Sequence, residues 1–327
     1  ARAEATIVRC LINQSKATSS LPSIHTEKAI DWAQGKAGFT FADQQAEAVR
    51  QALQSKISIL TGGPGTGKTT ILRALVSILR AKKTKILLAA PTGRAARRMA
   101  DSCSHFAQTV HRLLKFDPSQ GGFTMNDQNP LTCDFVIMDE ASMLDLRLAA
   151  ALIRSLPPKA HLLLVGDADQ LPSVGSGNVL KDLIECQLFQ VTRLAVTFRQ
   201  SENSGIVGLA HGILGGKGSP PPPVDSPSEI NPQHDVHFVR AETPEKCVTV
   251  VTKLSKDILP EKFSIDPKND LQILAPLHRG IGGIGNLNDQ LRDTLNPTGA
   301  TQVMGSLLFR EGDKVIQTRN NYDKDVF

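Results

Sequence analysis

The sequence is poor in aromatic residues and has no long apolar run. Phe, Trp and Tyr together make up 4% of the chain, with Trp32 and Tyr322 the single residues of their types. Stacking on nucleic-acid bases would therefore depend mainly on Phe and His. No apolar run approaches the length of a membrane-spanning helix, and the N-terminus lacks the apolar region of a signal peptide. We expect a cytoplasmic protein that does not bind a membrane.

Cysteine is sparse and shows no pairing pattern. The five cysteines are odd in number, scattered and never in a C-x-x-C spacing: Cys10, Cys103, Cys133, Cys186 and Cys247. This distribution is typical of a reducing compartment. It offers neither a disulfide framework nor the ligand spacing of a zinc site.

Acidic residues are almost missing from one stretch. Between Arg80 and Lys115 there are nine Lys or Arg residues and a single acid, Asp101. The whole chain has a net charge of +5, which by itself is weak evidence for a polyanionic partner. A basic stretch can be a solvated helix face or a surface that binds nucleic acid, and composition leaves both open.

Short apolar runs alternate with helical patterns in the first two thirds of the chain. The expected strands lie near 57–61, 85–90, 134–138 and 161–165, and the helices between them near 68–81, 94–102 and 146–155. Strands that alternate with helices indicate a parallel sheet. The strands are almost continuously apolar, as burial on both faces requires. The predicted fold is α/β.

The chain divides by composition into four segments. These are a polar helical segment at 1–36, a first α/β domain at 37–214, a Pro- and Gly-rich linker at 215–234 and a second α/β stretch at 235–327. In the last segment we expect strands near 236–240, 271–275 and 313–318. Residues 116–130 interrupt the first domain, and Gly121-Gly122 within them predicts a small hairpin.

The most informative motif follows the first strand. Residues 62–69 have the spacing Gly-x-x-x-x-Gly-Lys-Thr of a phosphate-binding P-loop. Glycines let backbone N–H groups turn toward phosphate oxygens, and the next helix directs its positive end at the same anion. A glycine-rich turn that binds nothing is the alternative, but the strand and helix around the loop favour a nucleoside triphosphate. The predicted binding set is Gly62, Gly63, Pro64, Gly65, Thr66, Gly67, Lys68, Thr69 and Thr70.

Two further strands end in polar residues. Asp139 and Glu140 follow the apolar run Phe135–Met138, where α/β folds place ligand sites. In a P-loop protein the first acid holds Mg²⁺ together with Thr69, and the second can act as a general base toward water. Gln170, in Gly166-Asp-Ala-Asp-Gln, can bond both a γ-phosphate and the attacking water. Read alone, each segment could also be an ordinary strand end or turn.

The order Gly-Lys-Thr, Asp-Glu, Gly-Asp-x-x-Gln resembles superfamily 1 helicases, and within them the RecD-type enzymes. Other stretches are similar to motifs of that family in the same order: Gln45 in 43–49, Pro91–Arg94, Thr109–Arg112, Thr197–Gln200, Leu274–Pro276 with Leu287-Asn288, and Glu311–Ile316 with Asn320–Asp323. The last two resemble the second motor domain of the longer, RecBCD-independent subgroup. The resemblance runs from about 40 to 327. It implies a RecA-like P-loop domain plus part of a second RecA-like α/β domain.

The resemblance also assigns roles to residues. It implies that Gln45 reads adenine and that Arg199 touches the γ-phosphate, beside the catalytic residues Lys68, Asp139, Glu140 and Gln170. It implies that single-stranded DNA is contacted by Pro91, Thr92, Arg94, Thr109 and His111. The hairpin expected at 116–130 falls where the family has its strand-splitting pin, and Phe116 and Phe123 could meet a duplex junction. A plain surface excursion is an equal alternative.

We therefore expect an ATP- and Mg²⁺-dependent DNA helicase or translocase that moves 5′ to 3′ on single-stranded DNA in recombination and repair, beside recombination or nuclease proteins. The sequence does not indicate an oligomeric state. It ends at Phe327, before any segment similar to the family's last two motifs, and does not start with Met. We expect a C-terminally truncated fragment with weak activity of its own. The alternative is a nucleotide- and DNA-binding subunit of a larger nuclease or conjugative relaxase complex without independent motor activity.

Overall fold

The computed structural model describes residues 2–119, 121–196, 204–305 and 307–316. The chain divides into two compact units, Ala1–Ser201 and Glu202–Phe327. Among the described residues, no helix combines the length and apolar character needed to cross a membrane. The domain limits expected from composition, 37–214 and 235–327, stay predictions.

The first unit contains a sheet of six strands in the order β3-β2-β6-β7-β1-β8, and every neighbouring pair is parallel. The strands are β1 (Ile57–Gly62), β2 (Ile86–Ala90), β3 (Ala107–Thr109), β6 (Phe135–Met138), β7 (His161–Gly166) and β8 (Gln190–Leu194). The four strands predicted from apolar runs are confirmed to within one residue. The sequence missed both edge strands, because β3 is short and β8 alternates polar with apolar residues.

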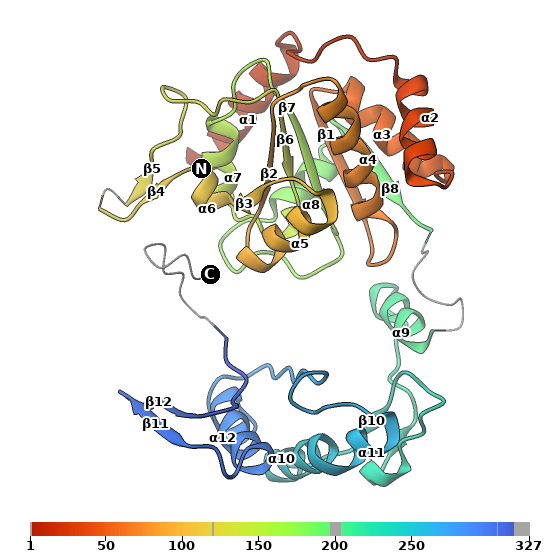
Figure 1. Cartoon of the computed structure of the whole chain (residues 1–327), viewed down its shortest axis with the longest axis vertical. Coiled ribbons are helices and arrows are strands. Elements are labelled where there is room, and N and C mark those ends of the chain that lie inside the picture. The colour runs from red at the N-terminus through yellow and green to blue at the C-terminus, as the bar shows by residue number, and fades with distance from the viewer. Residues whose placement is uncertain (1, 120, 197–203, 306, 317–327) are drawn as a thin grey trace. The chain divides into compact units, whose positions relative to one another are not determined.

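Helices cover both faces of this sheet (Figure 1). One face packs against α1 (Arg2–Lys16), α6 (Val110–Leu113), α7 (Leu146–Arg154) and α8 (Val179–Glu185). The other packs against α2 (Thr26–Ala37), α3 (Asp43–Gln54), α4 (Lys68–Ala81) and α5 (Gly93–Cys103). Successive strand residues alternate between the two cores, so that Val136 and Met138 face one and Phe135 and Ile137 the other. The predicted α/β fold with a doubly covered parallel sheet is confirmed.

The N-terminal segment is joined to the amino edge of the sheet by polar contacts. Gln14 of α1 is buried and donates to the carbonyl oxygens of Pro157 (3.0 Å) and Ala160 (2.7 Å). The His161 ring bonds the Ser19 hydroxyl through Nε2 (2.7 Å) and the Ser55 carbonyl through Nδ1 (2.9 Å). Because the Gln14 and His161 side chains are buried and hydrogen-bonded, they fix where the segment docks.

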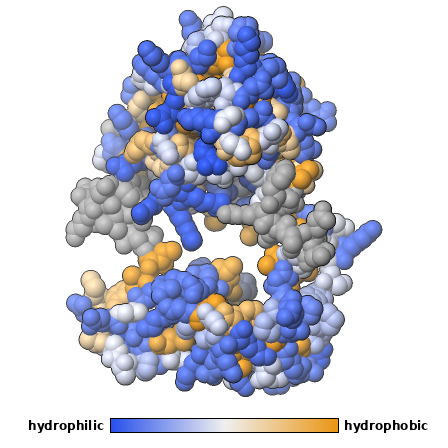
Figure 2. Space-filling view, turned by 45° about the vertical axis from the view of Figure 1, so that its right-hand side comes forward, coloured by the Kyte–Doolittle hydropathy of each residue, from blue (hydrophilic) through white to orange (hydrophobic). Residues whose placement is uncertain are grey.

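The second unit contains helices and two short sheets. Its helices are α9 (Gly205–Leu214), α10 (Pro244–Lys253), α11 (Leu259–Phe263) and α12 (Ile284–Leu295). β9 (Pro223–Val224) pairs with β10 (Phe238–Val239), and β11 (Thr301–Met304) with β12 (Leu307–Arg310). The strand predicted at 271–275 is wrong: these residues have no regular secondary structure, and Leu274 is 89% exposed. On the face drawn in Figure 2, hydrophobic residues lie in small groups among hydrophilic ones.

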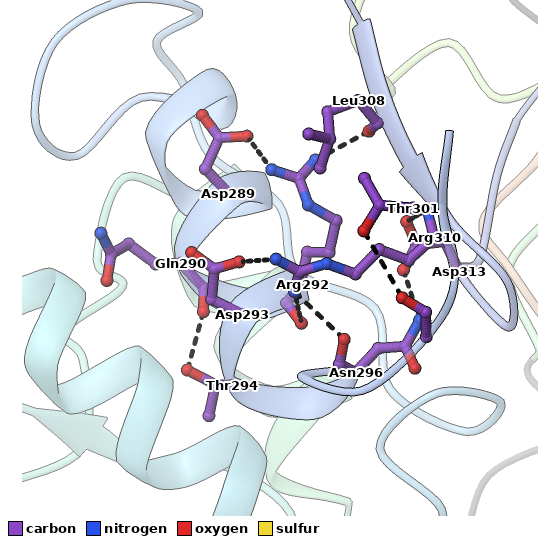
Figure 3. Close-up of polar contacts among 11 residues, drawn as sticks. Asp289, Gln290, Arg292, Asp293, Thr294, Asn296, Thr301, Leu308, Arg310 and Asp313 are labelled. Carbon is purple, nitrogen blue, oxygen red and sulfur yellow. Dashed lines mark hydrogen bonds and ion pairs between the residues drawn. The ribbon is translucent and has the colours of Figure 1, made fainter. Parts of the chain in front are cut away.

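Two arginines join α12 to the β11–β12 hairpin (Figure 3). Arg292 donates to the Leu308 carbonyl (3.0 Å) and pairs with Asp289 (2.7 Å). Arg310 pairs with Asp293 (2.7 Å) and donates to the carbonyl at the end of α12 on Asn296 (3.1 Å). Cations at a helix C-terminus are favourable, so these contacts hold a hairpin that would be marginal alone.

The docking of the N-terminal segment predicts a pH dependence of stability. Burial, with the nearby Lys56 charge, lowers the pKa of His161 to about 4, below the ordinary value of 6.5. As pH falls, His161 therefore binds its proton in the unfolded chain at a higher pH than in the folded chain. The stabilisation is complete above pH ~6.5 and is lost toward pH ~4, by about 3 kcal/mol.

Urea unfolding of the chain between pH 7 and pH 4 measures this effect. His161→Gln, which removes the titrating ring, should unfold with a shallower pH slope over that window. Equal slopes for the two proteins would contradict the interpretation.

Candidate active site

The P-loop runs from the end of β1 to the start of α4. Gly65 (φ 79°) and Gly67 (φ 90°) adopt left-handed backbone conformations that glycine reaches without strain. The Thr66 hydroxyl donates to the Gly63 carbonyl (2.9 Å), which closes the loop. Thr69 and Thr70 lie in the first turn of α4, where the helix dipole favours an anion.

Lys68 lies over the loop that precedes it. Its ammonium group donates to the carbonyl oxygens of Gly62 and Gly63, the second at 2.9 Å. Burial lowers the pKa of Lys68, while the charges of Asp167, Glu140 and Asp139 oppose that shift. The carboxylates that stabilise this partly buried cation therefore come from the ends of two other strands.

The acid pair follows β6. The Asp139 backbone N–H donates to the Ala89 carbonyl of β2 (2.9 Å), and one Asp139 carboxylate oxygen accepts the Glu140 N–H (2.9 Å). Burial raises the pKa of Asp139, and the Lys68 charge works against that rise. Glu140 has a left-handed backbone (φ 52°, ψ 42°), which is uncommon for a residue with a side chain.

Gln170 is held by a carboxylate that sequence reasoning missed. Asp167 is 4% exposed, and its carboxylate accepts from the Gln170 side-chain amide (3.1 Å) and from the Asp169 N–H (3.1 Å). The Thr61 hydroxyl of β1 accepts the Ala168 N–H (3.2 Å), which ties this turn to the strand before the P-loop. A Gly-Asp pair directly after a buried strand was the sequence signal for Asp167.

A pocket of about 250 Å³ lies beside the P-loop. Its lining comes from α3, the P-loop and the end of β8: Ala42, Asp43, Gln44, Gln45, Thr66, Leu194 and Val196. Gln45 is buried, and its side-chain oxygen accepts the Ala42 N–H (3.1 Å). The structure thus brings Gln45 next to the phosphate loop. Arg199 lies outside the described residues.

The candidate DNA contacts follow β2 and β3, whose ends are in register at Ala90 and Thr109. The Thr92 hydroxyl caps α5 by accepting the Ala95 N–H (3.2 Å), and the Thr109 hydroxyl caps α6 in the same way through Arg112 (3.3 Å). Pro91 lies between the end of β2 and Thr92, the N-cap of α5. A hollow of about 530 Å³ along α5 is lined by Arg94, Arg97, Arg98, Asp101 and Ser102. The N-termini of α5 and α6, capped by these two threonines, therefore lie at the same edge of the sheet.

The predicted hairpin is present as β4 (Phe116–Asp117) and β5 (Gly122–Phe123). Its two Phe rings are 5.3 Å apart, and the His111 ring lies 6.0 Å from Phe116 and 5.7 Å from Phe123. Edge contacts of this kind add to packing. The base of the hairpin thus packs on His111 of α6, which is itself a candidate DNA contact.

Comparison with known proteins finds relatives that are named helicases. A family model described as "AAA domain" matches residues 45–176. The chain is 32% identical, over 91% of its length, to the ATP-dependent RecD2 DNA helicase of Deinococcus radiodurans, of which it covers 39%. It is 30% identical, over 89% of its length, to RecBCD enzyme subunit RecD of Mycolicibacterium smegmatis, of which it covers 56%. The chain thus spans less than two thirds of either relative.

The close packing at the P-loop predicts a difference between neighbouring glycines. A Cβ on Gly62 would come within 2.9 Å of the Leu194 carbonyl oxygen, the Leu194 Cβ and the Thr66 hydroxyl, whereas one on Gly63 would meet no atom within 4 Å. Gly62→Ala should therefore lower the free energy of unfolding by about 1–3 kcal/mol, and the matched control Gly63→Ala by less than about 0.5 kcal/mol. Urea unfolding measures both, and equal losses would argue against the packing described.

Proposed function

This chain belongs to the RecD-type family of superfamily 1 helicases, and we propose that it forms the ATP-hydrolysing part of a DNA translocase. The observation that carries the proposal is the convergence of three strand ends. Lys68 follows β1, Asp139 and Glu140 follow β6, and Asp167 with Gln170 follows β7. Parallel strands bring these groups to one edge beside a P-loop.

The residues of this edge suit the hydrolysis of a nucleoside triphosphate. Lys68 and the N-terminus of α4 bind the phosphates and stabilise the charge that develops on them. Glu140 accepts a proton from the attacking water. The water oxygen bonds to the terminal phosphorus while the bond from that phosphorus to the bridging oxygen breaks. Gln170, oriented by Asp167, aligns that water. By family resemblance, Arg199 adds a further positive charge.

Magnesium fits the oxygen donors that the site offers. Thr69 supplies a hydroxyl and Asp139 a buried carboxylate, and Mg²⁺ prefers a few protein oxygens together with phosphate and water. When bound, the ion neutralises phosphate charge. We propose ATP as the nucleotide, because Gln45 lies in the pocket beside the loop.

We propose that single-stranded DNA follows the edge formed by Pro91–Arg94 and Thr109–His111. Two capped helix N-termini and the Arg94 side chain can contact phosphates without reading the sequence of bases. The hairpin that carries Phe116 and Phe123 would then meet a duplex junction. Movement from 5′ to 3′, a role in recombination and repair and a second motor domain at 235–327 are parts of the same proposal and rest on family resemblance.

A second candidate function is that of a subunit without independent motor activity. The similarity to RecD, a subunit of the RecBCD enzyme, favours it. The two functions differ in one measurement, because only an independent motor hydrolyses ATP faster when single-stranded DNA is added to the isolated protein.

The catalytic assignment predicts the effect of two substitutions. Lys68→Ala should lower DNA-stimulated ATP hydrolysis at least about 100-fold, and Glu140→Gln should do so while ATP binding is retained, because only proton transfer is removed. Steady-state phosphate release and calorimetric ATP binding measure the two effects. Lys181→Ala, which removes one partner of an exposed ion pair on α8, is the control. ATP turnover that survives either site substitution would refute the assignment.

The DNA assignment predicts a change in salt dependence. Arg94→Ala should weaken single-strand binding and reduce the slope of log affinity against log salt by about 0.7, the value for one lost phosphate contact. Lys82→Ala, at the far end of α4, removes the same single positive charge and should leave the slope of log affinity against log salt unchanged. Fluorescence anisotropy with a labelled oligonucleotide, measured between about 50 and 300 mM salt, gives both slopes. Identical slopes for the two variants would contradict a contact at Arg94.

A further inference from the structure

Two of the segments that line the pocket beside the P-loop are far apart in the sequence. Asp43, Gln44 and Gln45 come from the start of α3, whereas Leu194 ends β8 and Val196 follows that strand. Val196 is 53% exposed although it is apolar, whereas Leu194 is buried. An exposed apolar side chain in a pocket gains stability when an apolar ligand surface covers it.

One hydrogen bond joins these two segments at the pocket itself. The side-chain oxygen of Gln44 accepts the backbone N–H of Ala195 at 3.0 Å. Ala195 lies between Leu194, the last residue of β8, and Val196, and both of these residues line the pocket. Gln44 therefore ties the end of this strand to the start of α3.

A second glutamine makes a similar contact away from the pocket. The Thr192 hydroxyl donates to the side-chain oxygen of Gln51 at 2.9 Å. Gln51 and Thr192 join the same helix and strand, yet neither lines the pocket. The chain thus contains its own control for the effect of tying α3 to β8.

The strand end also touches the phosphate loop. Leu194 lies so close to Gly62 that a Cβ there would meet its backbone oxygen at 2.9 Å. Leu194 therefore lies between the P-loop on one side and the Gln44 tie on the other. Its neighbour Val196 stands three residues before Arg199 in the sequence.

We propose that Gln44 is a positioning residue for the base of the bound nucleotide. By holding Ala195, it keeps Leu194 and Val196 as an apolar wall for the face of a purine, while Gln45 meets the edge of the base. The inference rests on the proposed nucleotide binding. Because the phosphates bind at the P-loop, the tie affects ligands that carry a base and leaves a bare polyphosphate unaffected.

The test compares two ligands on three proteins. Calorimetry on the full chain gives the Kd of Mg·ATP and of Mg·tripolyphosphate for the parent, Gln44→Met and Gln51→Met. Met keeps the length of the side chain and removes the acceptor oxygen. Gln44→Met should weaken ATP binding about two- to tenfold, as expected for one lost hydrogen bond, and leave tripolyphosphate binding unchanged. Gln51→Met should change neither Kd.

Conservative replacement gives an independent check. Gln44→Glu keeps an acceptor oxygen and should bring the Kd of ATP back toward that of the parent. The inference is overturned if Gln44→Met weakens both ligands equally, if Gln51→Met has the same effect on ATP, or if Gln44→Glu behaves as Gln44→Met. If the parent binds neither ligand, the proposed function fails instead, so the two failures are distinguishable.

Discussion

Parallel pairing in a sheet buried on both faces is the constraint on which the rest of this structure depends. Side chains within such strands are apolar, so polar groups gather where the strands end. In this chain β1, β6 and β7 are neighbours and run in the same direction, and the P-loop, the acid pair and the Asp167 turn therefore meet at one edge. The helices that follow β1 and β2 add their N-termini to the same edge.

Charge balance at that edge follows from the same arrangement. A partly buried ammonium group is unfavourable alone, and Lys68 is stabilised by three carboxylates from two other strands. The buried Asp139 is stabilised in turn by Lys68 and by a backbone N–H. Each charge depends on groups far away in the sequence, so the site exists only in the folded sheet. When a polyphosphate binds, its oxygens would replace the Gly62 and Gly63 carbonyl oxygens as the acceptors for Lys68.

Local patterns predicted the central strands and the P-loop, because apolar runs and glycine spacing are properties of consecutive residues. They missed the edge strands β3 and β8, whose pairing is decided by neighbours, and they placed a strand at 271–275 where the structure has none. An apolar run becomes a strand only when another strand is beside it. The predicted hairpin was correct, since Gly121-Gly122 is a local turn signal, but its contact with His111 could not be read from the sequence.

The sequence by itself determined the patterns from which the ligand chemistry is predicted: a phosphate loop, an acid pair after a buried strand and a basic stretch, all recognised by residue type and short spacing. Only the tertiary structure decided which groups act together. It brought Asp167 into a hydrogen bond with Gln170, Gln44 into a hydrogen bond with Ala195, and the hairpin into ring contact with His111. The physical reason is that hydrogen bonds and ring contacts depend on distances of a few ångströms. Apart from the Asp167 turn, these distances join residues that only chain folding brings together.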